Sequence, residues 1–584
     1  MYVSRIPNRK SKPTWLIRES KWVNGKSVKT TIVNITKLPL PIILQIKELF
    51  RGGIVVKSIQ DAFTLISSKP HGHVAIVLHM IKKLGIPKLL AHRDSRNRRL
   101  VLGMIAARVL HPSSKLATST LLDRCSASST LNEELELKGV DSDDLYEAMD
   151  WLIERKTDME YRLSKRHLTE GGMVLYDLTS SYVEGKQNEL AAFGYNRDRK
   201  RGKKQIVIGL MTDQEGCPVS VQIYKGNTSD PRTLSDQVTK LKETFGLQHV
   251  VMVGYRGILT HKGIQQELVP VGMDWISALR KDTIASVVKQ TKTVDLDKLD
   301  KQSLMEVQTD LFPQDRLIFC KNSVQKAMKQ KRREEFLVQT EKALEQIVIA
   351  TKRKTKPLKC ETAIAIKVDR VVEKHKMKKY FHLEVKEGHL AYGRDKSAIE
   401  RSAELDGVYA IRTSLKEVPP SNEDIVLDYK RLSAVESAFR SMKNISLKIR
   451  PIHHRRKKRV QAHVFLCMLA YYVEYHLRKE LAPVLFSEDD LEGKQAQRKD
   501  VVASASSSDQ TKTKVRRKRN KDGDKVMSFG SLMNELSGVI RIIGKPNINT
   551  DSTPEVVILH GLEGTRKRAF DLLGIKIQSS SPKG

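Results

Sequence analysis

The chain has 584 residues, of which 40% are hydrophobic, and its 104 lysines and arginines against 68 aspartates and glutamates give a formal net charge of +36. A length of this order allows about two to four domains with sizeable cores. The basic excess predicts a polyanionic partner and favours nucleic acid; a ribosomal or membrane-surface role, or plain solubility, is the alternative. No apolar run approaches the ~18 residues of a membrane span. The five cysteines form no CxxC pair, so their spacing indicates neither a zinc site nor a disulfide framework.

The first 170 residues are predicted to contain a small β element followed by a helical region. Residues 15–35 favour a hairpin, because Asn24-Gly25 is a strong two-residue turn signal between β-forming residues. Helical patterns cover 75–84, 98–110 and 143–167, the last after an acidic start. We therefore expect a β-hairpin in 1–40 and a helical DNA-binding region in 41–170. A solvated helical bundle without a DNA role is the alternative.

The hydrophobic period changes to that of strands at Gly172. Strands are expected at 172–182, 205–212 and 218–224, and the short turn between the last two makes an antiparallel meander the simplest pairing. A helix with Asp230 as N-cap and Pro231 at its first position should lead to a fourth strand at 249–254, parallel to the first. A fifth strand is expected at 275–279. Three antiparallel strands, helix, strand, helix and strand is the order of a ribonuclease-H-like mixed sheet, so the predicted fold class is α/β, with 171–285 as the first part of this core.

Asp177 is the first candidate for chemistry. It follows the apolar run at 173–176 inside the first of these strands. Burying a carboxylate is costly unless a metal ion or hydrogen-bond donors compensate it, which makes Asp177 a candidate metal ligand. An ordinary aspartate that caps a turn at the strand end is the alternative.

The rest of the chain is predicted to interrupt and then complete this core. Residues 286–415 form a β-containing insertion with a charged helix near 325–349. A helix then runs from a capping box at Ser421 to Lys443, and Glu436 stands on its otherwise core-directed face; an ion pair with Arg440 is the alternative role. This glutamate helix and the apolar helix at 460–477 end the core, in 416–482. Residues 483–526 are expected to be a disordered basic linker, and 527–584 a C-terminal helical tail.

Four pieces of the sequence, taken in order, resemble the DDE transposases of prokaryotic insertion sequences. They are YDLTS at 176–180, GNTSD at 226–230, VGYRG at 253–257, and YKRL at 429–432 followed by VESAFRSMK at 435–443. More narrowly, the chain looks like the branch with a β-rich insertion and a Tyr-Arg-Glu-Lys signature. Each piece alone is weak, but their order and spacing over residues 14–574 are specific.

The resemblance implies a chemistry and a set of roles. In such enzymes three carboxylates hold two divalent ions about 3.5–4 Å apart, which clamp the attacking and leaving oxygens of phosphoryl transfer at the DNA ends. Mg²⁺ is the expected ion, with Mn²⁺ as a substitute. By position Asp177 and Glu436 are the first and third carboxylates and the metal ligands. Lys443 and Arg440 would contact DNA phosphate, and Tyr429 would pack at the helix start. Where the signature carries Arg, this sequence has Leu432.

The sequence departs from the family at the position of the second catalytic Asp, which is Tyr255. A tyrosine is neutral below a pKa of about 10 and does not bridge two ions as a carboxylate does. Asp274, the nearest later aspartate, is expected at the wrong end of the sheet. We therefore predict a transposase that binds DNA but is impaired or inactive in strand transfer. A catalytically dead DNA-binding derivative that occupies transposon ends is the alternative, and a structure-specific nuclease is a third interpretation.

Basic residues outside the signature are predicted to bind DNA. Arg256 follows Tyr255, and the run at 448–459 would follow the DNA backbone through Arg455, Arg456, Lys457 and Lys458; a solvated charge run is the alternative. A basic loop at 197–204 allows the same two interpretations. The resemblance implies inverted-repeat ends and target DNA as partners, a homodimer on paired ends, and no membrane. The expected location is the nucleoid in the cytoplasm of a prokaryote.

Overall fold

The computed structural model describes residues 1–9, 11–23, 25–52, 63–123, 128–185, 187–198, 200, 202–291, 294–416, 420–488, 500–503, 507–546 and 555–576. The described residues divide into two compact units. The terminal unit falls within Met1–Val74, Ala127–Thr130 and Asn534–Gly584, and the core unit falls within Ala75–Ser126 and Leu131–Met533. No described helix is both long and apolar enough to cross a membrane.

The terminal unit contains two small antiparallel sheets. The predicted hairpin is confirmed by strands β2 (Thr14–Val23) and β3 (Lys26–Asn34), although Asn24 of its turn lies outside the described residues. A strand that the sequence analysis did not foresee, β1 (Tyr2–Ile6), pairs with β2, and α1 (Leu40–Leu49) packs Ile43 against their apolar side chains. The second sheet and the final helix consist of β16 (Val556–His560), β15 (Ile540–Pro546), β4 (Phe63–Pro70) and α23 (Gly564–Leu572). The segment 527–584 was expected to be a helical tail; α23 is helical, but β15 and β16 of the same segment are strands, because they pair with each other and β15 pairs with β4.

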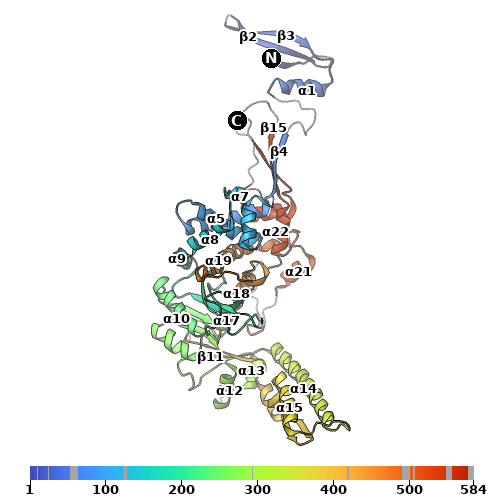
Figure 1. The fold of residues 1–584 in the computed structure, drawn as a ribbon. Helices are drawn as coiled ribbons and strands as arrows, with labels where there is room; N and C mark the ends of the chain where they lie inside the picture. The colour runs from blue at the N-terminus through green and yellow to red at the C-terminus, as the bar shows by residue number, and fades with distance from the viewer. Residues whose placement is uncertain are drawn as a thin grey trace. The chain divides into compact units, whose positions relative to one another are not determined.

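The core unit is mixed α/β and is built on an eight-stranded mixed sheet in the order β10-β11-β14-β9-β8-β5-β6-β7 (Figure 1). The strands are β5 (Met173–Tyr182), β6 (Gln205–Thr212), β7 (Pro218–Lys225), β8 (Val251–Gly254), β9 (Asp274–Ala278), β10 (Leu304–Val307), β11 (Arg316–Lys321) and β14 (Val408–Thr413). The predicted pairing is confirmed, because β5, β6 and β7 form an antiparallel meander and β8 lies parallel to β5. Strand β9 continues the parallel direction beside β8.

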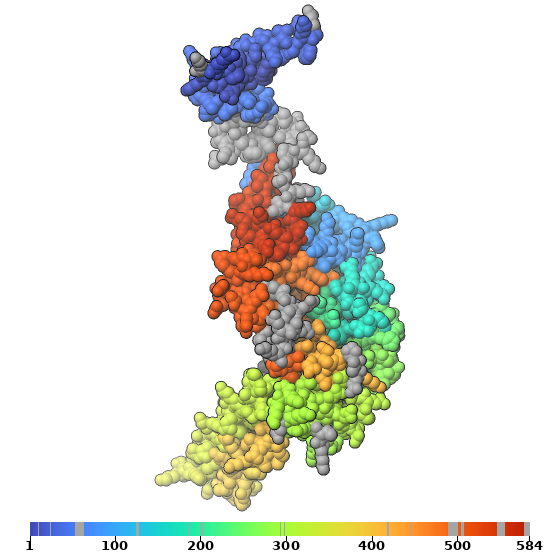
Figure 2. All heavy atoms as spheres, turned by 180° about the vertical axis from the view of Figure 1, so that it is seen from behind, coloured from blue at the N-terminus to red at the C-terminus, as the bar shows by residue number. Residues whose placement is uncertain are grey.

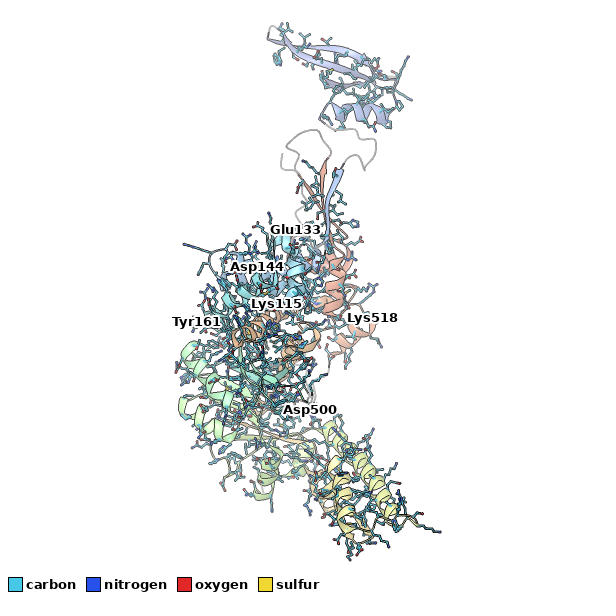
Figure 3. The ribbon with its side chains drawn as sticks, in the orientation of Figure 1. Lys115, Glu133, Asp144, Tyr161, Asp500 and Lys518 are labelled. Atoms are coloured by element: carbon cyan, nitrogen blue, oxygen red, sulfur yellow. The ribbon has the colours of Figure 1, made fainter. Side chains whose placement is uncertain are left out.

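A layer of helices packs on this sheet. It comprises α3 (Gly72–Lys83), α4 (Ile86–Leu90), α5 (Arg96–Leu110), α6 (Lys115–Leu122), α7 (Leu131–Glu134), α8 (Ser142–Ile153), α9 (Lys156–His167) and α19 (Lys457–Glu480). Helix α19 packs against α5, α8 and strand β7, and it is apolar and buried around most of its circumference because it forms the centre of the layer. Figure 3 shows the side chains of this layer, with Lys115 buried in it and Tyr161 exposed at its margin.

One predicted helix of this layer is wrong in its extent. The sequence favours a single helix over 143–167, but the chain forms α8 and α9 with a turn at Glu154-Arg155 between them. Helix α8 begins with a capping box between Asp141 and Asp144, in agreement with its acidic start. The turn allows α9 to pack against β7 while α8 packs against α5 and α19.

The insertion between β9 and the glutamate helix extends the central sheet and also contains a separate two-stranded antiparallel sheet. Strands β10, β11 and β14 add to the edge of β9. The rest of the insertion consists of α12 (Lys281–Gln290), α13 (Leu296–Gln302), α14 (Ser323–Thr351), α15 (Glu361–Lys374), β12 (Phe381–Lys386), β13 (His389–Arg394) and α16 (Lys396–Glu404). Helices α14 and α15 share an apolar core that includes Leu344 and Ile364, and in Figure 2 the yellow side chains of this segment form one continuous body.

The glutamate helix is divided into three parts. Helix α17 (Asn422–Lys430) begins at the predicted capping box of Ser421 and Asp424. A single helix to Lys443 was predicted, but α17 ends at Lys430, α18 (Leu432–Arg440) follows after Arg431, and η5 (Ser441–Ile445) is a π-helical turn. The division has a local cause, because the Arg431 amide is shared between the carbonyl groups of Leu427 and Asp428, and its own carbonyl accepts from Ala434 three residues on.

The polar segment predicted to be a disordered linker is wrong in part. Residues 509–517 form helix α21 (Asp509–Arg517), whose N-cap Ser508 accepts from the Thr511 amide. Glu488 accepts from the hydroxyl groups of Ser508 and Thr511, at 2.7 and 2.5 Å, so polar side chains stabilise a helix that has little apolar surface. Residues 489–499 and 504–506 of the predicted linker lie outside the described residues. Helix α22 (Phe529–Ser537) follows in the segment expected to be amphipathic.

Candidate active site

Strands β5 and β8 place two of the predicted site residues side by side. Tyr176 is paired with Gly254, the last residue of β8, so Asp177 on β5 and Tyr255 after β8 take the next positions along two parallel neighbours. Helix α18 packs against β5 and brings in Glu436 from a distant part of the sequence. The Tyr255 hydroxyl donates a hydrogen bond of 2.5 Å to Oε1 of Glu436. The structure therefore brings Asp177, Tyr255 and Glu436 together.

The two carboxylates of this cluster influence one another electrostatically. Burial, together with the negative charges of Glu436 and Asp230, raises the pKa of Asp177 to about 7, although the Leu178 amide and Arg197 oppose the shift. Carboxylates that share a site disfavour each other's charged form, and a cation between them removes that penalty. A cation held beside Asp177 and Glu436 would therefore favour the ionised form of Asp177.

The Tyr255 phenol is a neutral hydrogen-bond donor in this site. Burial and the adjacent Glu436 carboxylate raise the pKa of Tyr255 well above its ordinary value. The ring of Tyr429 meets the ring of Tyr255 edge to face, with 6.2 Å between the ring centres, and burial raises the pKa of Tyr429 to about 12. Tyr429, in the last turn of α17, therefore packs against Tyr255, and both phenols keep their protons at neutral pH.

The described residues do not fit a pair of divalent ions. Two such ions need shared anionic oxygen ligands. Asp177 and Glu436 supply two carboxylates, but the protonated Tyr255 phenol occupies one oxygen of Glu436, and both oxygens of the nearby Asp230 accept from Arg197. Asp274 does not supply the third carboxylate: it pairs with Val251 at the start of β8 and accepts from the Ser414 hydroxyl at 2.8 Å. The prediction that Asp274 lies at the other end of the strand is confirmed.

Asp230 has a different role from the one predicted. It was expected to cap a helix, but α10 (Arg232–Thr239) begins after Pro231 without a side-chain cap. Both carboxylate oxygens of Asp230 instead accept from Arg197, at 2.6 Å each. Arg197 belongs to the basic loop at 197–204, for which DNA binding and a solvated charge run were both left open, and this ion pair holds the loop beside Asp177. Sequence analysis missed the pair because its members lie 33 residues apart and each has an ordinary local role.

Lys443 is buried in the structure and does not face solvent. Its side chain is 9% exposed, and its ammonium group donates to Oγ1 of Thr179 at 2.9 Å and to Asp198 at 2.6 Å. Arg450 contacts the same carboxylate at 2.6 Å. The contact of Lys443 with DNA phosphate remains a prediction, and in this state of the protein the lysine joins η5 to β5.

Arg440 and Arg256 lie on the surface near the carboxylates. Arg440 is exposed one turn beyond Glu436, and the described residues show no ion pair between these two side chains. Arg256 is exposed directly after Tyr255 and donates to the Leu279 carbonyl at 3.3 Å. Both guanidinium groups are accessible to a phosphate, and their DNA contacts remain predictions.

The predicted basic run lies along the continuation of β5. Ile452 forms a bridge with Val183, and the side chain of Asn188 donates to the His454 carbonyl at 2.7 Å. The exposed members of the run then follow at the start of α19; they are Arg455, Arg456, Lys457 and Lys458. Arg459 differs from them, because it pairs with Asp150 at 3.0 Å. The run therefore forms an exposed cationic edge next to the strand that carries Asp177.

Comparison with known proteins identifies the family. The model of the transposase DDE domain matches residues 170–473, just over half of the chain and all of the cluster described above. Among solved structures, a piggyBac transposase synaptic complex with hairpin DNA is similar over 69% of this chain and 72% of that chain, with 11% identity and a TM-score of 0.35. No curated protein matches the sequence. The family match alone decides the assignment: this chain belongs to the family of transposases that carry a DDE domain.

Proposed function

We propose that this chain is a DDE transposase of the insertion-sequence type that binds the ends of its element but is impaired in cutting and joining DNA. The sheet order around β5 and β8 supports a ribonuclease-H-like core, interrupted by an insertion that contributes strands to it. The family generally uses divalent metal ions, and Mg²⁺ would be the physiological ion. The Tyr-Arg-Glu-Lys signature of one prokaryotic branch is matched here by Tyr429, Glu436 and Lys443, with Leu432 in place of Arg.

The DNA-binding part of the proposal rests on charge and exposure. The chain carries a net charge of +36, and the cationic edge at 455–458 is exposed beside the strand of Asp177. Such an edge would follow a phosphate backbone, with binding that weakens steeply as the salt concentration rises. The partners would be inverted-repeat ends and target DNA, bound by a homodimer at the nucleoid of a prokaryotic cell.

The observation that carries the impairment is the hydrogen bond between Tyr255 and Glu436. It places a neutral phenol where the family has a carboxylate, and it occupies an oxygen of the carboxylate that remains. We derive no metal-assisted step for this chain, because its residues do not fit the two-ion arrangement. These residues instead bind one another: the Tyr255 hydroxyl donates to Glu436, and the ring of Tyr429 packs against the ring of Tyr255.

A binding assay and a strand-transfer assay on the same DNA test the proposal. The DNA would be the two ends that flank the gene, with Mg²⁺ or Mn²⁺ present. We expect sequence-preferring binding of the ends and no joined product, with product appearing in Tyr255→Asp. Clear turnover by the chain as it stands would refute the impairment, and failure to prefer its own ends would refute the end-binding role.

The alternative is a catalytically dead derivative that only occupies transposon ends. The burial of Lys443 favours it, because a residue predicted to touch DNA near the cut serves here as a structural ion pair. The two functions differ in the response to repair of the second acid. If Tyr255→Asp binds ends and yields no product at any metal concentration, the alternative replaces the first proposal.

A further inference from the structure

A second cluster of ligand-type side chains lies at the end of the sheet where β5 begins. His167 ends α9, Cys217 precedes β7, and His476 is on the last turns of α19. One nitrogen of each imidazole and the Cys217 sulfur all lie within 4.8 Å of one another, which no other group of three such residues in the described chain achieves. None of these residues belongs to the DNA-processing chemistry proposed above.

The distances match a tetrahedral metal site. Cys217 Sγ lies 3.7 Å from Nε2 of His476 and 4.0 Å from Nε2 of His167. Metal–sulfur and metal–nitrogen bonds of about 2.3 and 2.05 Å at a tetrahedral angle place sulfur and nitrogen about 3.6 Å apart. Shifts of a few tenths of an ångström would therefore bring each Nε2 atom to the distance from the sulfur that two ligands of one ion have. The same ring nitrogen, Nε2, faces the sulfur in both histidines.

The other nitrogen of His167 faces a carboxylate, as in many metal-binding histidines, although the separation is longer than a hydrogen bond. Nδ1 of His167 lies 3.8 Å from the Asp213 carboxylate. Asp213 is itself held by the turn between β6 and β7, where its Oδ1 accepts from the amides of Glu215 and Cys217 at 2.9 Å each. A carboxylate beyond the ligating imidazole fixes the ring and its tautomer, and the same turn presents the thiol.

A cavity gives an ion access to the cluster. It has a volume of about 350 Å³ and is lined by His167, Cys217 and His476 together with Asp213. Glu215 and Lys479 also line the cavity and form an ion pair of 2.8 Å with each other, so the charge of Lys479 is compensated. A water molecule that enters this cavity could serve as the fourth ligand of an ion held by the three side chains.

Two alternatives to metal binding fit the cluster less well. The Tyr472 hydroxyl lies 2.9 Å from Nε2 of His167, so that imidazole has a partner without a metal ion. Among the described residues, His476 then has Cys217, at 3.7 Å, as its only side-chain hydrogen-bonding partner. A reactive thiol is disfavoured, because the Cys217 side chain is buried and only 1% exposed. Coordination would give the Cys217 sulfur and both Nε2 atoms one shared partner.

We propose that His167, Cys217 and His476 form a site for a thiophilic divalent ion of the zinc class, separate from the carboxylate cluster. Thiolate and imidazole ligands select such ions, whereas carboxylates suit Mg²⁺ and Mn²⁺. The site joins α9, the β6–β7 turn and α19, so the bound ion fastens the central helix of the layer to the sheet. The thiol proton leaves to solvent on binding.

The test uses the full-length, metal-free protein and Co²⁺ as a spectroscopic probe. We expect a thiolate-to-cobalt charge-transfer absorption that saturates at one ion per chain and is displaced by Zn²⁺. It should be lost in Cys217→Ser and weakened in His476→Gln. It should persist in Cys467→Ser, a matched change of another buried cysteine, and in Asp177→Asn. Asp213→Asn should weaken Co²⁺ binding by about 10–100-fold.

An absorption that survives Cys217→Ser, or no charge-transfer band in the unaltered chain, would overturn the proposal. Should Cys217→Ser fail to fold, X-ray absorption of the Zn²⁺-loaded unaltered chain decides. One sulfur with nitrogen or oxygen neighbours supports the site, and a shell without sulfur refutes it.

Discussion

Two side-chain clusters beside the central sheet differ in what they can hold. The cluster of Asp177, Tyr255 and Glu436 offers hard oxygen ligands, but Tyr255 and Glu436 are joined to each other by a hydrogen bond of 2.5 Å. The cluster of His167, Cys217 and His476 offers soft ligands. Its sulfur–nitrogen distances are close to those between two ligands of one metal ion. The comparison shows that the family of a chain does not indicate which of its side-chain clusters is better suited to a metal ion. The chemistry and the spacing of the donor atoms indicate it.

Repair of the second acid should have the largest effect on this comparison. Tyr255→Asp removes the phenol from Glu436 and supplies the missing carboxylate, so we expect strand transfer to rise by about 100- to 1000-fold, the usual effect of one catalytic group. Product formation on end DNA measures it. Tyr255→Phe is the control, because it removes the same hydrogen bond without adding a ligand, and activity in the Phe variant would contradict the argument.

The raised pKa of Asp177 predicts a pH-dependent stability. The pKa of the Asp177 carboxyl group is about 7 in the folded protein and near the ordinary value of 3.8 in the unfolded chain. Between these two values the folded state binds the proton more tightly, so the free energy of unfolding should fall as the pH rises from about 4 to 7. Asp177 is partly exposed, so we expect Asp177→Asn to be more stable by roughly 2–3 kcal/mol at pH 8, with chelator present. The gain should vanish at pH 4. Denaturant titrations measure it, and an equal gain at both pH values would argue against the burial of this carboxyl group.

Lys443 should behave as a structural residue in the free protein. Lys443→Met breaks the buried bonds to Thr179 and Asp198, but Arg450 still contacts Asp198, so we expect a loss of about 1–2 kcal/mol in the free energy of unfolding. Chemical denaturation measures the loss. Arg440→Met, an exposed neighbour, is the matched control and should change stability by less than about 0.5 kcal/mol. Equal effects of the two changes would mean that Lys443 is not buried in solution.

The cationic edge should produce the smallest effect, confined to DNA. Arg455→Gln with Arg456→Gln should weaken binding to any duplex about tenfold and reduce the slope of binding against salt by about 2, because two phosphate contacts are lost. Filter binding at several salt concentrations measures both. Arg459→Gln is the control for position, since Arg459 pairs with Asp150. A change that alters sequence preference without altering the salt slope would contradict a backbone role.

The sequence was sufficient for the core strands because their local signals agree with their packing. The short turn at Asp213–Gly216 indicated antiparallel pairing, and the helix that connects β7 to β8 indicated that β8 is parallel to β5. The capping box at Ser421 was readable for the same reason. Disorder at 509–517 was wrongly predicted, because its helix depends on hydrogen bonds from Glu488, which hydrophobic periodicity does not register.

The sites were predictable only where a short signature carried them. Asp177, Tyr255 and Glu436 each stand in a recognisable piece, so their meeting was expected. The Cys–His cluster has no such signal: Cys217 is 50 residues from His167 and 259 from His476, and the spacing rules for zinc sites depend on ligands close in sequence. The ion pair of Arg197 and Asp230 was missed for the same reason. These contacts arise only when the chain folds, so no local sequence pattern indicates them.

The most direct test of the central claim counts the divalent ions bound by the carboxylate cluster. Calorimetric titration with Mn²⁺, in a Cys217→Ser background that removes the soft site, should show at most one weakly bound ion in the chain with Tyr255 and two in Tyr255→Asp. Two tightly bound ions in the chain that keeps Tyr255, lost on Asp177→Asn, would contradict the account.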